Sequence, residues 1–392
     1  MKHRTRSMQA THSSIYTEAV IPVPHAASSA TSIDWYEFLE RPRLPSPATE
    51  ALAHLRDSSI LITGAGGSIG SALSLQLARL GPRHLALLDA SEQALYRLQS
   101  AFADAQLPVQ PQLILANITD AVHLDEIVET HRPELIFHAA AYKHVPLLEE
   151  HPLEAIANNA LGTLTLADCA KKHSIARLVL VSTDKAVTPI SILGASKRIA
   201  ERITLDHEGV VLRLANVLGS EGSVSETFLC QIAAGSPVTI TDPDAERYFL
   251  TCEEAVDLLL ASAGAKTGSI LVPNLDRQYK ISSLAEFLIR TSPSEARPSI
   301  AFTGLRPGDK IREVLWSPEE RPMPAPIQGH LEMERRASGD ALLRRELMHL
   351  KDAVRERDLP RALEIVLQLV PSYTPSATVQ ALQRKALGAL QS

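Results

Sequence analysis

The segment "STDKAVTPISILGASK" (182–197) gathers side chains of the kind that move protons. Thr183, Asp184 and Lys185 are adjacent, and Lys197 follows twelve residues after Lys185. A carboxylate and an amine held side by side can serve as general acid and general base, which suits removal of water next to a carbonyl group. In most loops the same two residues form an ordinary solvated ion pair. The place of this segment in the fold therefore decides between the two interpretations.

A glycine-rich segment, "TGAGGSIG" (63–70), indicates a dinucleotide site. It follows an apolar run of strand length and opens a helical pattern. Gly64 permits a tight turn, Gly67 lets the backbone approach a pyrophosphate, and Gly70 allows close packing of helix on strand. A purely structural turn is the alternative, which the flanking strand and helix disfavour. The contacts expected in this loop are Gly64, Gly67, Ser68, Ile69 and Gly70.

An acidic residue, Asp89, ends the second apolar run, 19 residues beyond Gly70. Its carboxylate can accept hydrogen bonds from a ribose diol and would repel a 2′-phosphate, so NAD is favoured over NADP. Small alanines after the fourth run leave room for a cofactor, although plain packing is the alternative. The further cofactor contacts expected are Ser91, Asn117, Ile118, Ala139, Ala140 and Ala141.

Short apolar runs alternate with segments of helical length and predict an α/β fold. Continuous apolar runs suit parallel strands that are buried on both faces. They predict a Rossmann-type, doubly wound parallel sheet with a smaller C-terminal α/β substrate domain. Ligands bind at the carboxyl edge of such sheets, where Asp184 and Lys185 follow the fifth run. The expected strands are 59–63, 84–89, 112–117, 134–140, 177–183 and 210–216.

The succession of strand-like, helix-like and Pro-rich segments divides the chain into four regions. Residues 1–45 are expected to form a flexible tail, and 46–216 the NAD-binding Rossmann domain. Residues 217–317 are expected to form the sugar-nucleotide-binding domain, with some segments returning to the Rossmann core. Residues 318–392 then hold a Pro-rich linker, "PEERPMPAPIQGH", followed by C-terminal helices.

Composition excludes several classes of protein. The 392 residues carry a net charge of −6, which gives no reason to expect nucleic acid as a partner. No apolar run approaches the length of a membrane span. Cys169, Cys230 and Cys252 are scattered without metal-ligand spacing, so we expect reduced thiols, no metal and a cytoplasmic location.

Six motifs in one order resemble a known family. The chain, from about residue 38 to about 376, is similar to the polysaccharide-biosynthesis branch of the extended short-chain dehydrogenase/reductases. Within that branch it resembles the nucleotide-sugar 4,6-dehydratases that act on UDP-N-acetylglucosamine. The motifs are "ILITGAGGSIGSAL", "LLDASEQALYRLQ", "FHAAAYKHVPLLEEHPLEAIANNALGT", "VLVSTDKAVTPISILGASKRIAE", "RLANVLGSEGSVSETFLCQIAAGSPVTITDPDAERYFLT" and "FTGLRPGDKIREVL".

The resemblance implies a mechanism with tightly bound NAD. Hydride leaves C4 of the sugar, water is eliminated across C5 and C6, and hydride returns to C6. Transferred to this sequence, the family's roles make Lys185 the base at C5 and Asp184 the acid at the C6 oxygen. Thr183 would lie near the C4 oxygen, and Lys197 would bind the nicotinamide ribose. A free lysine titrates near about 10.4. We therefore expect burial, Lys197 and the nicotinamide cation to lower the pKa of Lys185.

The resemblance also implies a UDP-sugar site, and we expect a homo-oligomer. Arginines near the end of the matched region suit a diphosphate, since a guanidinium binds phosphate with a planar fork, although surface ion pairs are the alternative. The residues expected to bind substrate are Lys143, His144, Asn216, Arg247 and Arg306.

Two positions depart from the family pattern. Leu193 stands four residues before Lys197, where many relatives have a tyrosine that deprotonates the C4 hydroxyl, and some have methionine. Asn117 stands where aspartate is common. A nucleotide-sugar C4 or C5 epimerase and a non-catalytic dinucleotide sensor or scaffold are therefore alternatives. The retained Asp184 and Lys185 favour the dehydratase, with Asp184, directly or through Thr183 or water, as the base for the C4 hydroxyl.

Overall fold

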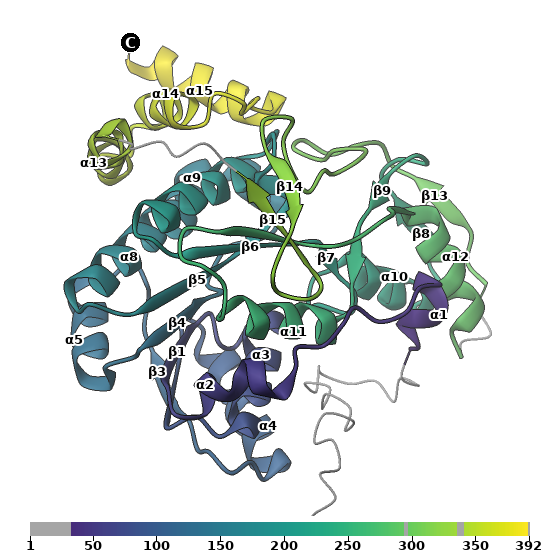
Figure 1. The fold of residues 1–392 in the computed structure, drawn as a ribbon. Coiled ribbons are helices and arrows are strands. Elements are labelled where there is room, and N and C mark those ends of the chain that lie inside the picture. The colour runs from purple at the N-terminus through teal and green to yellow at the C-terminus, as the bar shows by residue number, and fades with distance from the viewer. Residues whose placement is uncertain (1–32, 294–296, 335–340, 391–392) are drawn as a thin grey trace, which may run out of the picture.

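A mostly parallel sheet forms the centre of the molecule (Figure 1). The computed structural model describes residues 33–293, 297–334 and 341–390. Neighbouring strands from β3 to β11 pair in parallel, whereas β15 pairs antiparallel with β11 and β14, which confirms the predicted fold class. In spatial order the strands are β14 (Arg321–Pro324), β15 (His330–Glu334), β11 (Ile270–Pro273), β6 (Val210–Leu214), β5 (Arg177–Thr183), β4 (Leu135–His138), β1 (Ser59–Thr63), β2 (His84–Asp89) and β3 (Gln112–Leu115).

Each face of the sheet supports its own apolar core. In β1 the side chains of Ile60 and Ile62 enter one core cluster and that of Leu61 enters the other, because successive residues of a strand point to opposite faces. The first cluster includes α3 (Ser68–Leu80), α4 (Glu92–Ala105) and α11 (Cys252–Ser262). The second includes α5 (Ala121–His131), α8 (Gly162–Lys172) and much of α9 (Ile192–Asp206).

The loops at the carboxyl edge begin where these strands end. β3 and β4 stop at Leu115 and His138, so the expected cofactor residues beyond them lie in loops. The sixth predicted strand divides, since β6 ends at Leu214 and β7 (Asn216–Val217) pairs with a different sheet. Short helical segments are η2 (Thr49–Leu52), α2 (Ala53–Arg56), α6 (Val145–Glu150), α7 (Pro152–Ala155), η3 (Ile156–Leu161) and η4 (Asp184–Ala186).

A third core belongs to the smaller part of the molecule. Its helices are α10 (Val224–Ala233) and α12 (Ile281–Thr291). Its strand pairs are β8 (Val238–Ile240) with β13 (Ile300–Phe302), β9 (Glu246–Arg247) with β12 (Tyr279–Lys280), and β7 with β10 (Phe249–Leu250). The helix α11 and strand β11 return to the main sheet, as expected for some segments of this region.

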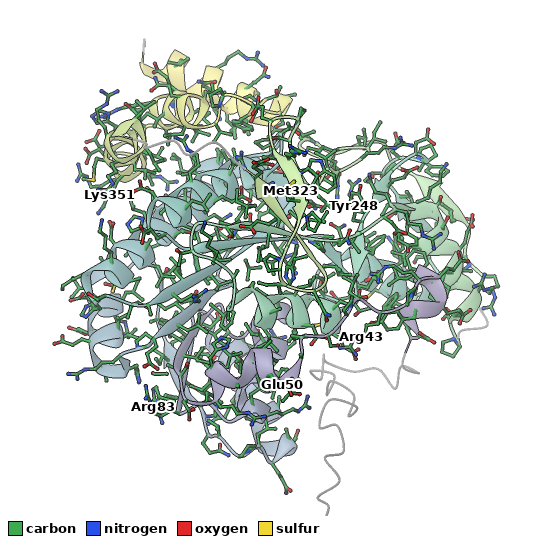
Figure 2. All side chains as sticks on the ribbon, in the orientation of Figure 1. Arg43, Glu50, Arg83, Tyr248, Met323 and Lys351 are labelled. Atoms are coloured by element: carbon green, nitrogen blue, oxygen red, sulfur yellow. The ribbon has the colours of Figure 1, made fainter. Side chains whose placement is uncertain are left out.

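The N-terminal segment corrects one prediction. Residues 34–45 are not a flexible tail, because α1 (Trp35–Leu39) buries Phe38 and Leu39 in the third core. Beyond it, Arg41 pairs with Glu254 at 2.6 Å, and Arg43 (labelled in Figure 2) pairs with Asp257 at 2.7 Å. Residues 1–32 of the predicted tail lie outside the described residues.

The Pro-rich segment corrects a second prediction. Residues 321–324 of the expected linker form β14, whose only strand neighbour in the described sheet is β15, and prolines are tolerated on such an edge strand. The C-terminal helices then pack on the core that α8 and α9 share (Figure 1). They are α13 (Ala341–Arg355), α14 (Leu359–Leu369) and α15 (Ala377–Leu390). Among the described residues, no helix has the length and apolarity of a membrane span.

Candidate active site

The glycine loop joins β1 to α3 in the geometry of a phosphate-binding turn. Gly64 has a φ of +72°, and a Cβ there would lie 2.5 Å from the backbone nitrogen of Ala140. A Cβ on Gly70 would lie 2.0 Å from the carbonyl oxygen of Gly64. At Gly67 the nearest atom would be 3.5 Å away, and no side chain caps the start of α3. The open side of Gly67 and the uncapped helix start fit a pyrophosphate.

Asp89 connects the glycine loop to the next helix. Its Oδ2 accepts from the backbone nitrogen of Gly66 at 2.9 Å, and its Oδ1 accepts from that of Ser91 at 2.9 Å. The Ser91 hydroxyl caps α4 through the backbone nitrogen of Ala94. A carboxylate has about four acceptor sites, so Asp89 retains sites for a ribose diol. Ser91 acts here as a helix cap that holds the Asp89 loop in place.

The remaining predicted cofactor residues line the same edge with different exposures. Asn117 is exposed, and its Oδ1 accepts from both the backbone nitrogen and the hydroxyl of Thr119. Ile118 is buried, and a Cβ on Gly162 would lie 2.7 Å from its Cδ1. Ala139, Ala140 and Ala141 are half-buried beside the glycine loop, whereas Ser68 and Ile69 begin α3 and are also half-buried.

Asp184 occupies the carboxyl end of β5 as a fully buried carboxylate. Its Oδ1 accepts from Lys185 Nζ at 3.0 Å and from the Thr183 hydroxyl at 3.0 Å. Its Oδ2 has no hydrogen-bond partner among the described residues. A buried acceptor without a partner is costly, so this oxygen is well suited to receive a proton or a hydrogen bond from a ligand.

Lys185 is held in its charged form, which corrects a prediction. Its Nζ donates to Asn216 Oδ1 at 3.0 Å and lies 3.8 Å from Glu313 Oε1. Burial lowers the pKa of Lys185, but the carboxylates of Asp184 and Glu313 more than offset this, and the pKa is raised. The expected lowering was wrong because two carboxylates surround the amine. The nearby cation that lowers the pKa of Lys185 is Arg247. Lys197 had been expected to have this effect.

Burial lowers the pKa of Lys197, as it also does for Lys143. The side chain of Lys197 is buried in α9, and burial lowers its pKa to about 8. Its Nζ donates to the carbonyl oxygen of Val181 at 2.7 Å, next to the catalytic segment. One turn earlier, Leu193 is 4% exposed within the apolar core, so it packs and carries no proton. The next residue, Gly194, brings α9 against the loop, since a Cβ there would lie 2.2 Å from the carbonyl oxygen of Lys185.

The two predicted diphosphate arginines have different surroundings. The guanidinium of Arg247 donates to the carbonyl oxygens of Lys310 at 2.7 Å and Ile311 at 2.9 Å. Its charge lowers the pKa of Lys185, so the structure brings Arg247 near Lys185. The side chain of Arg306 is 57% exposed and pairs with Asp309 at 2.8 Å. The surface ion pair that was the alternative for Arg306 is therefore present.

The loop that contains Glu221 and Gly222 contacts Lys143 and His144, which are both exposed. Lys143 donates to the carbonyl oxygen of Glu221. A Cβ on Gly222 would lie 2.4 Å from His144 Cε1, so the loop lies directly against that ring. The backbone nitrogen of Glu221 donates to Ser68 Oγ at 2.9 Å. The loop thus joins Lys143 and His144 to the start of the phosphate-binding helix.

Glu313 is a site residue that the sequence reasoning missed. It is 2% exposed, and its two oxygens face different lysines. Oε2 accepts from Lys310 Nζ at 2.9 Å, while Oε1 faces Lys185. Lys310 also donates to the carbonyl oxygen of Val187, just beyond η4. The only signal in the sequence was a Lys–Glu pair three residues apart in "GDKIRE".

A buried ion-pair network behind the site was also missed. Arg213 of β6 is fully buried and pairs with Glu201 of α9 at 2.8 Å and with Glu320 at 2.7 Å. Burial raises the pKa of Glu320, but Arg213, together with Arg198 and the backbone of Ser317, more than offsets this and lowers the pKa to about 2. Glu201 also accepts from the Ser182 hydroxyl at 2.7 Å. The signal was a single arginine within an apolar strand, which requires a buried partner.

His138, at the end of β4, is held neutral beneath the site. Burial lowers its pKa to about 3. Its Nδ1 lies 2.7 Å from Thr63 Oγ1 and its Nε2 lies 2.9 Å from Thr163 Oγ1. Because the Thr163 hydroxyl donates to the carbonyl oxygen of Asn159, Nε2 must be the donor to Thr163. His138 therefore ties β1 to α8 as a neutral imidazole.

Known proteins resemble this chain in sequence and in fold. Residues 60–333 match the family model described as "Polysaccharide biosynthesis protein". The chain is 40% identical over 278 residues to the capsular polysaccharide biosynthesis protein CapD of Staphylococcus aureus, covering 68% of this chain and 46% of CapD. It therefore spans about half the length of that relative.

Two further similarities come from a curated epimerase and a solved structure. The chain is 30% identical over 280 residues to the UDP-glucose 4-epimerase of Rickettsia rickettsii, covering 67% of this chain and 79% of the epimerase. The X-ray structure of Pen from Bacillus thuringiensis superposes with a TM-score of 0.67 at 26% identity, covering 72% of this chain and 88% of Pen.

Proposed function

Because the chain belongs to the polysaccharide biosynthesis protein family, we propose that it is an NAD-dependent nucleotide-sugar 4,6-dehydratase. The proposed substrate is UDP-N-acetylglucosamine, and the product is its 4-keto-6-deoxy derivative for surface polysaccharide or glycan synthesis. The observation that carries this proposal is the ion pair between the buried Asp184 and the half-buried Lys185 at the carboxyl edge of the sheet. An epimerase that only oxidises and reduces C4 has less need of such a pair.

The proposed cofactor site uses the glycine loop and Asp89. The start of α3 receives the pyrophosphate beside Gly67, and Asp89 receives the adenosine ribose. When bound there, NAD⁺ accepts the hydride of sugar C4 and returns it to C6. Lys197 is proposed to bind the nicotinamide ribose through donors that its bond to Val181 leaves free.

Asp184 is the proposed base for the C4 hydroxyl, since Leu193 has no proton to exchange. Its Oδ2 has no partner among the described residues and can take the hydroxyl proton as C4 is oxidised. Asp184 is then a carboxylic acid, which is the form needed to protonate the departing C6 oxygen. Thr183 donates to Oδ1 and so orients the carboxyl group.

Glu313 makes it possible for Lys185 to act as the base at C5. Protonation of Asp184 removes the charge that contributes most to raising the pKa of Lys185. Lys185 can then pass its proton to Glu313 Oε1, 3.8 Å away, and become a neutral amine. The C5–H bond breaks toward this amine, the C6–O bond breaks with a proton from Asp184, and water leaves.

The cycle closes with the same three groups. As hydride reaches C6, Lys185 returns its proton to C5 and regains one from Glu313. Asp184 is again a carboxylate, and the proton of the C4 hydroxyl has left in the water molecule. Every group ends in its starting state, which catalysis requires.

Binding of the sugar nucleotide completes the proposal. Asn216 orients the amine of Lys185, and Lys143 and His144 are proposed to line the sugar site. Arg247 and Arg306 are proposed to bind the diphosphate. The homo-oligomer and the cytoplasmic location remain predictions.

A nucleotide-sugar 4-epimerase is the second candidate. It is favoured by the identity with the Rickettsia epimerase and by the raised pKa of Lys185, because an epimerase needs no base at C5. Incubation of the purified protein with UDP-N-acetylglucosamine and NAD⁺, followed by chromatography that resolves sugar-nucleotide isomers and by mass spectrometry, separates the candidates. Loss of one water supports the dehydratase, whereas a new stereoisomer of unchanged mass supports the epimerase. Bound NAD with no conversion of the sugar would overturn both.

A further inference from the structure

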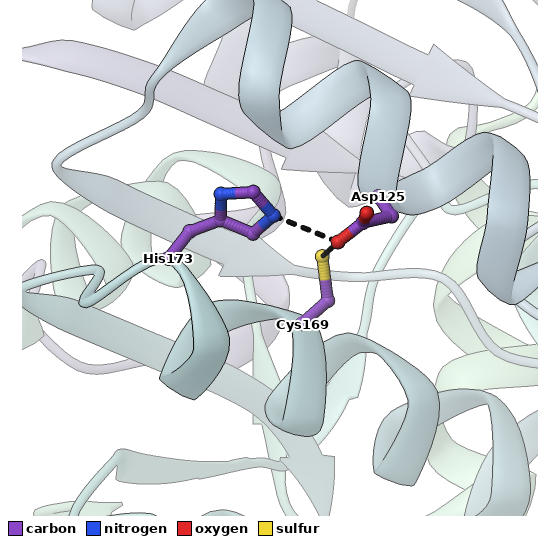
Figure 3. A group of neighbouring side chains, drawn as sticks. All are labelled: Asp125, Cys169 and His173. Atoms are coloured by element: carbon purple, nitrogen blue, oxygen red, sulfur yellow. Dashed lines mark hydrogen bonds and ion pairs between the residues drawn. The ribbon is translucent and has the colours of Figure 1, made fainter.

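A cysteine, a histidine and an aspartate meet between the helices α5 and α8 (Figure 3). Cys169 of α8 and His173, which caps that helix, are four residues apart and share one helical face. Asp125 of α5 faces both of them. Asp125 Oδ1 lies 2.7 Å from His173 Nε2 and 4.0 Å from Cys169 Sγ, and the ligand atoms of the three residues lie within 4.8 Å of one another.

We propose that Asp125, Cys169 and His173 form a zinc site with three protein ligands and an open fourth position. Thiolate, imidazole and carboxylate are the ligands that zinc takes in proteins, and the thiolate disfavours magnesium and calcium. One thiolate and one carboxylate would balance the charge of Zn²⁺, which suits the largely buried Cys169.

The distances are compatible with tetrahedral coordination after small movements. Zinc–ligand bonds of about 2.0 to 2.3 Å place neighbouring ligand atoms roughly 3.3 to 3.8 Å apart. The separation of His173 Nε2 from Asp125 Oδ1 would therefore widen, and that of Cys169 Sγ from the same oxygen would shorten, each by less than about 1 Å. The side chains of His173 and Asp125 are 20% and 31% exposed, so solvent can reach the fourth position.

A competing cation occupies part of this cluster. Lys172 Nζ pairs with Asp125 Oδ2 at 2.6 Å. Removal of Lys172 frees the carboxylate, so zinc affinity should rise, by up to about fivefold for an exposed pair. If the cluster is only a contact between helices, the loss of Lys172 should leave metal affinity unchanged.

The proposed zinc site is separate from the proposed active site. His173 lies four residues before β5 begins, whereas Thr183 ends that strand. The seven residues of β5 span about 20 Å. Zinc is therefore expected to stabilise the contact between α5 and α8 without entering the sugar chemistry.

Titration of the chelator-treated 392-residue protein with Co²⁺ tests the proposal. Binding of one equivalent should produce a thiolate-to-cobalt charge-transfer band in the near ultraviolet, and Zn²⁺ should abolish that band by displacement. Cys169→Ser should remove the band, and His173→Gln should weaken binding at least tenfold. Cys230→Ser, at an exposed cysteine, is the matched control and should change neither.

The outcomes are decisive even if one variant folds poorly. NAD binding verifies the fold of each variant, and His173→Gln provides a second test where Cys169→Ser does not fold. If Co²⁺ produces no thiolate-to-cobalt charge-transfer band, the proposal is overturned. A charge-transfer band that survives Cys169→Ser, or that disappears in Cys230→Ser, also overturns it.

Discussion

The two halves of the carboxyl edge of the sheet are built in different ways. Beside β1 and β2, the site is formed by the backbone of a glycine-rich loop. Glycine is needed at positions 64 and 70 because a Cβ at Gly64 or Gly70 would collide with backbone atoms. Beside β5 and β6, it consists of charged side chains, with the half-buried Lys185 between the buried carboxylates of Asp184 and Glu313. The first half is shaped to accept a ligand, and the second is set to exchange protons.

The two halves differ in how far apart along the chain their interacting residues lie. Asp89 and its partner Gly66 lie 23 residues apart, within one strand–helix–strand unit. Lys185 has partners 31 and 128 residues further along the chain, at Asn216 and Glu313. The hydrogen bonds of Asp89 are therefore local, although Gly64 packs against the more distant Ala140, whereas the proton affinities in the catalytic half depend on distant segments. Four predictions test this contrast.

The largest effect is expected from Lys185→Ala. Turnover of UDP-N-acetylglucosamine should fall by about a thousandfold or more, since the base at C5 is lost. NAD binding should persist, because the cofactor half does not use Lys185. Steady-state kinetics and NAD titration measure the two effects. The exposed Lys351→Ala is the control, and normal turnover in Lys185→Ala would refute the assigned role.

A smaller loss is expected from Glu313→Gln. Glutamine cannot hold the proton of Lys185, so turnover should fall roughly tenfold to a hundredfold. The residual activity should rise with pH, because Lys185 must then release its proton to solvent. A pH–rate profile measures this, with the exposed Glu319→Gln as control. An unchanged rate and profile would exclude Glu313 from the proton transfers.

Two glycine variants should separate fold from cofactor binding. Gly70→Ala should destabilise the fold by at least about 3 kcal/mol, because the new Cβ meets a carbonyl oxygen. Gly67→Ala should leave the melting temperature nearly unchanged and weaken NAD binding by about tenfold, equivalent to ~1.4 kcal/mol. Calorimetry measures stability and binding, with Gly264→Ala as control. Equal NAD affinity in Gly67→Ala and the unmodified protein would contradict the pyrophosphate site.

The smallest effect concerns the neutral histidine between the two halves. His138 has a pKa of about 3 in the folded protein, against about 6.5 when unfolded. Between these values only the unfolded chain binds the proton, so the free energy of unfolding falls as pH falls, by ~1.4 kcal/mol per pH unit. His138→Gln should lack this contribution.

Denaturant unfolding between about pH 5 and 6.5 measures the slope of stability against pH. The slope should be flatter in His138→Gln than in the unmodified protein. His123→Gln, at a half-exposed histidine, is the control and should keep the original slope. Parallel profiles for His138→Gln and the unmodified protein would show that His138 is not buried in its neutral form.

Most of the sheet could be predicted because its signals are local. Continuous apolar runs placed six parallel strands, and the glycine pattern placed the turn after β1. The strand β14 was missed because prolines are poor strand formers, and only an edge position next to β15 accommodates them. The anchoring of Arg41 and Arg43 was missed because their acidic partners lie more than 200 residues away.

The sequence alone determined the fold class, the glycine loop with Asp89, and the grouping of Asp184 and Lys185 after one strand. Each of these follows from periodicity or from neighbours in the chain. Only the tertiary structure decided in which direction the pKa of each lysine shifts. Lys185 lies between Asp184 and Glu313 and its pKa is raised, whereas burial lowers the pKa of Lys197 to about 8. A pKa depends on the charges and solvent around a group, and here those are brought together by the packing of distant segments.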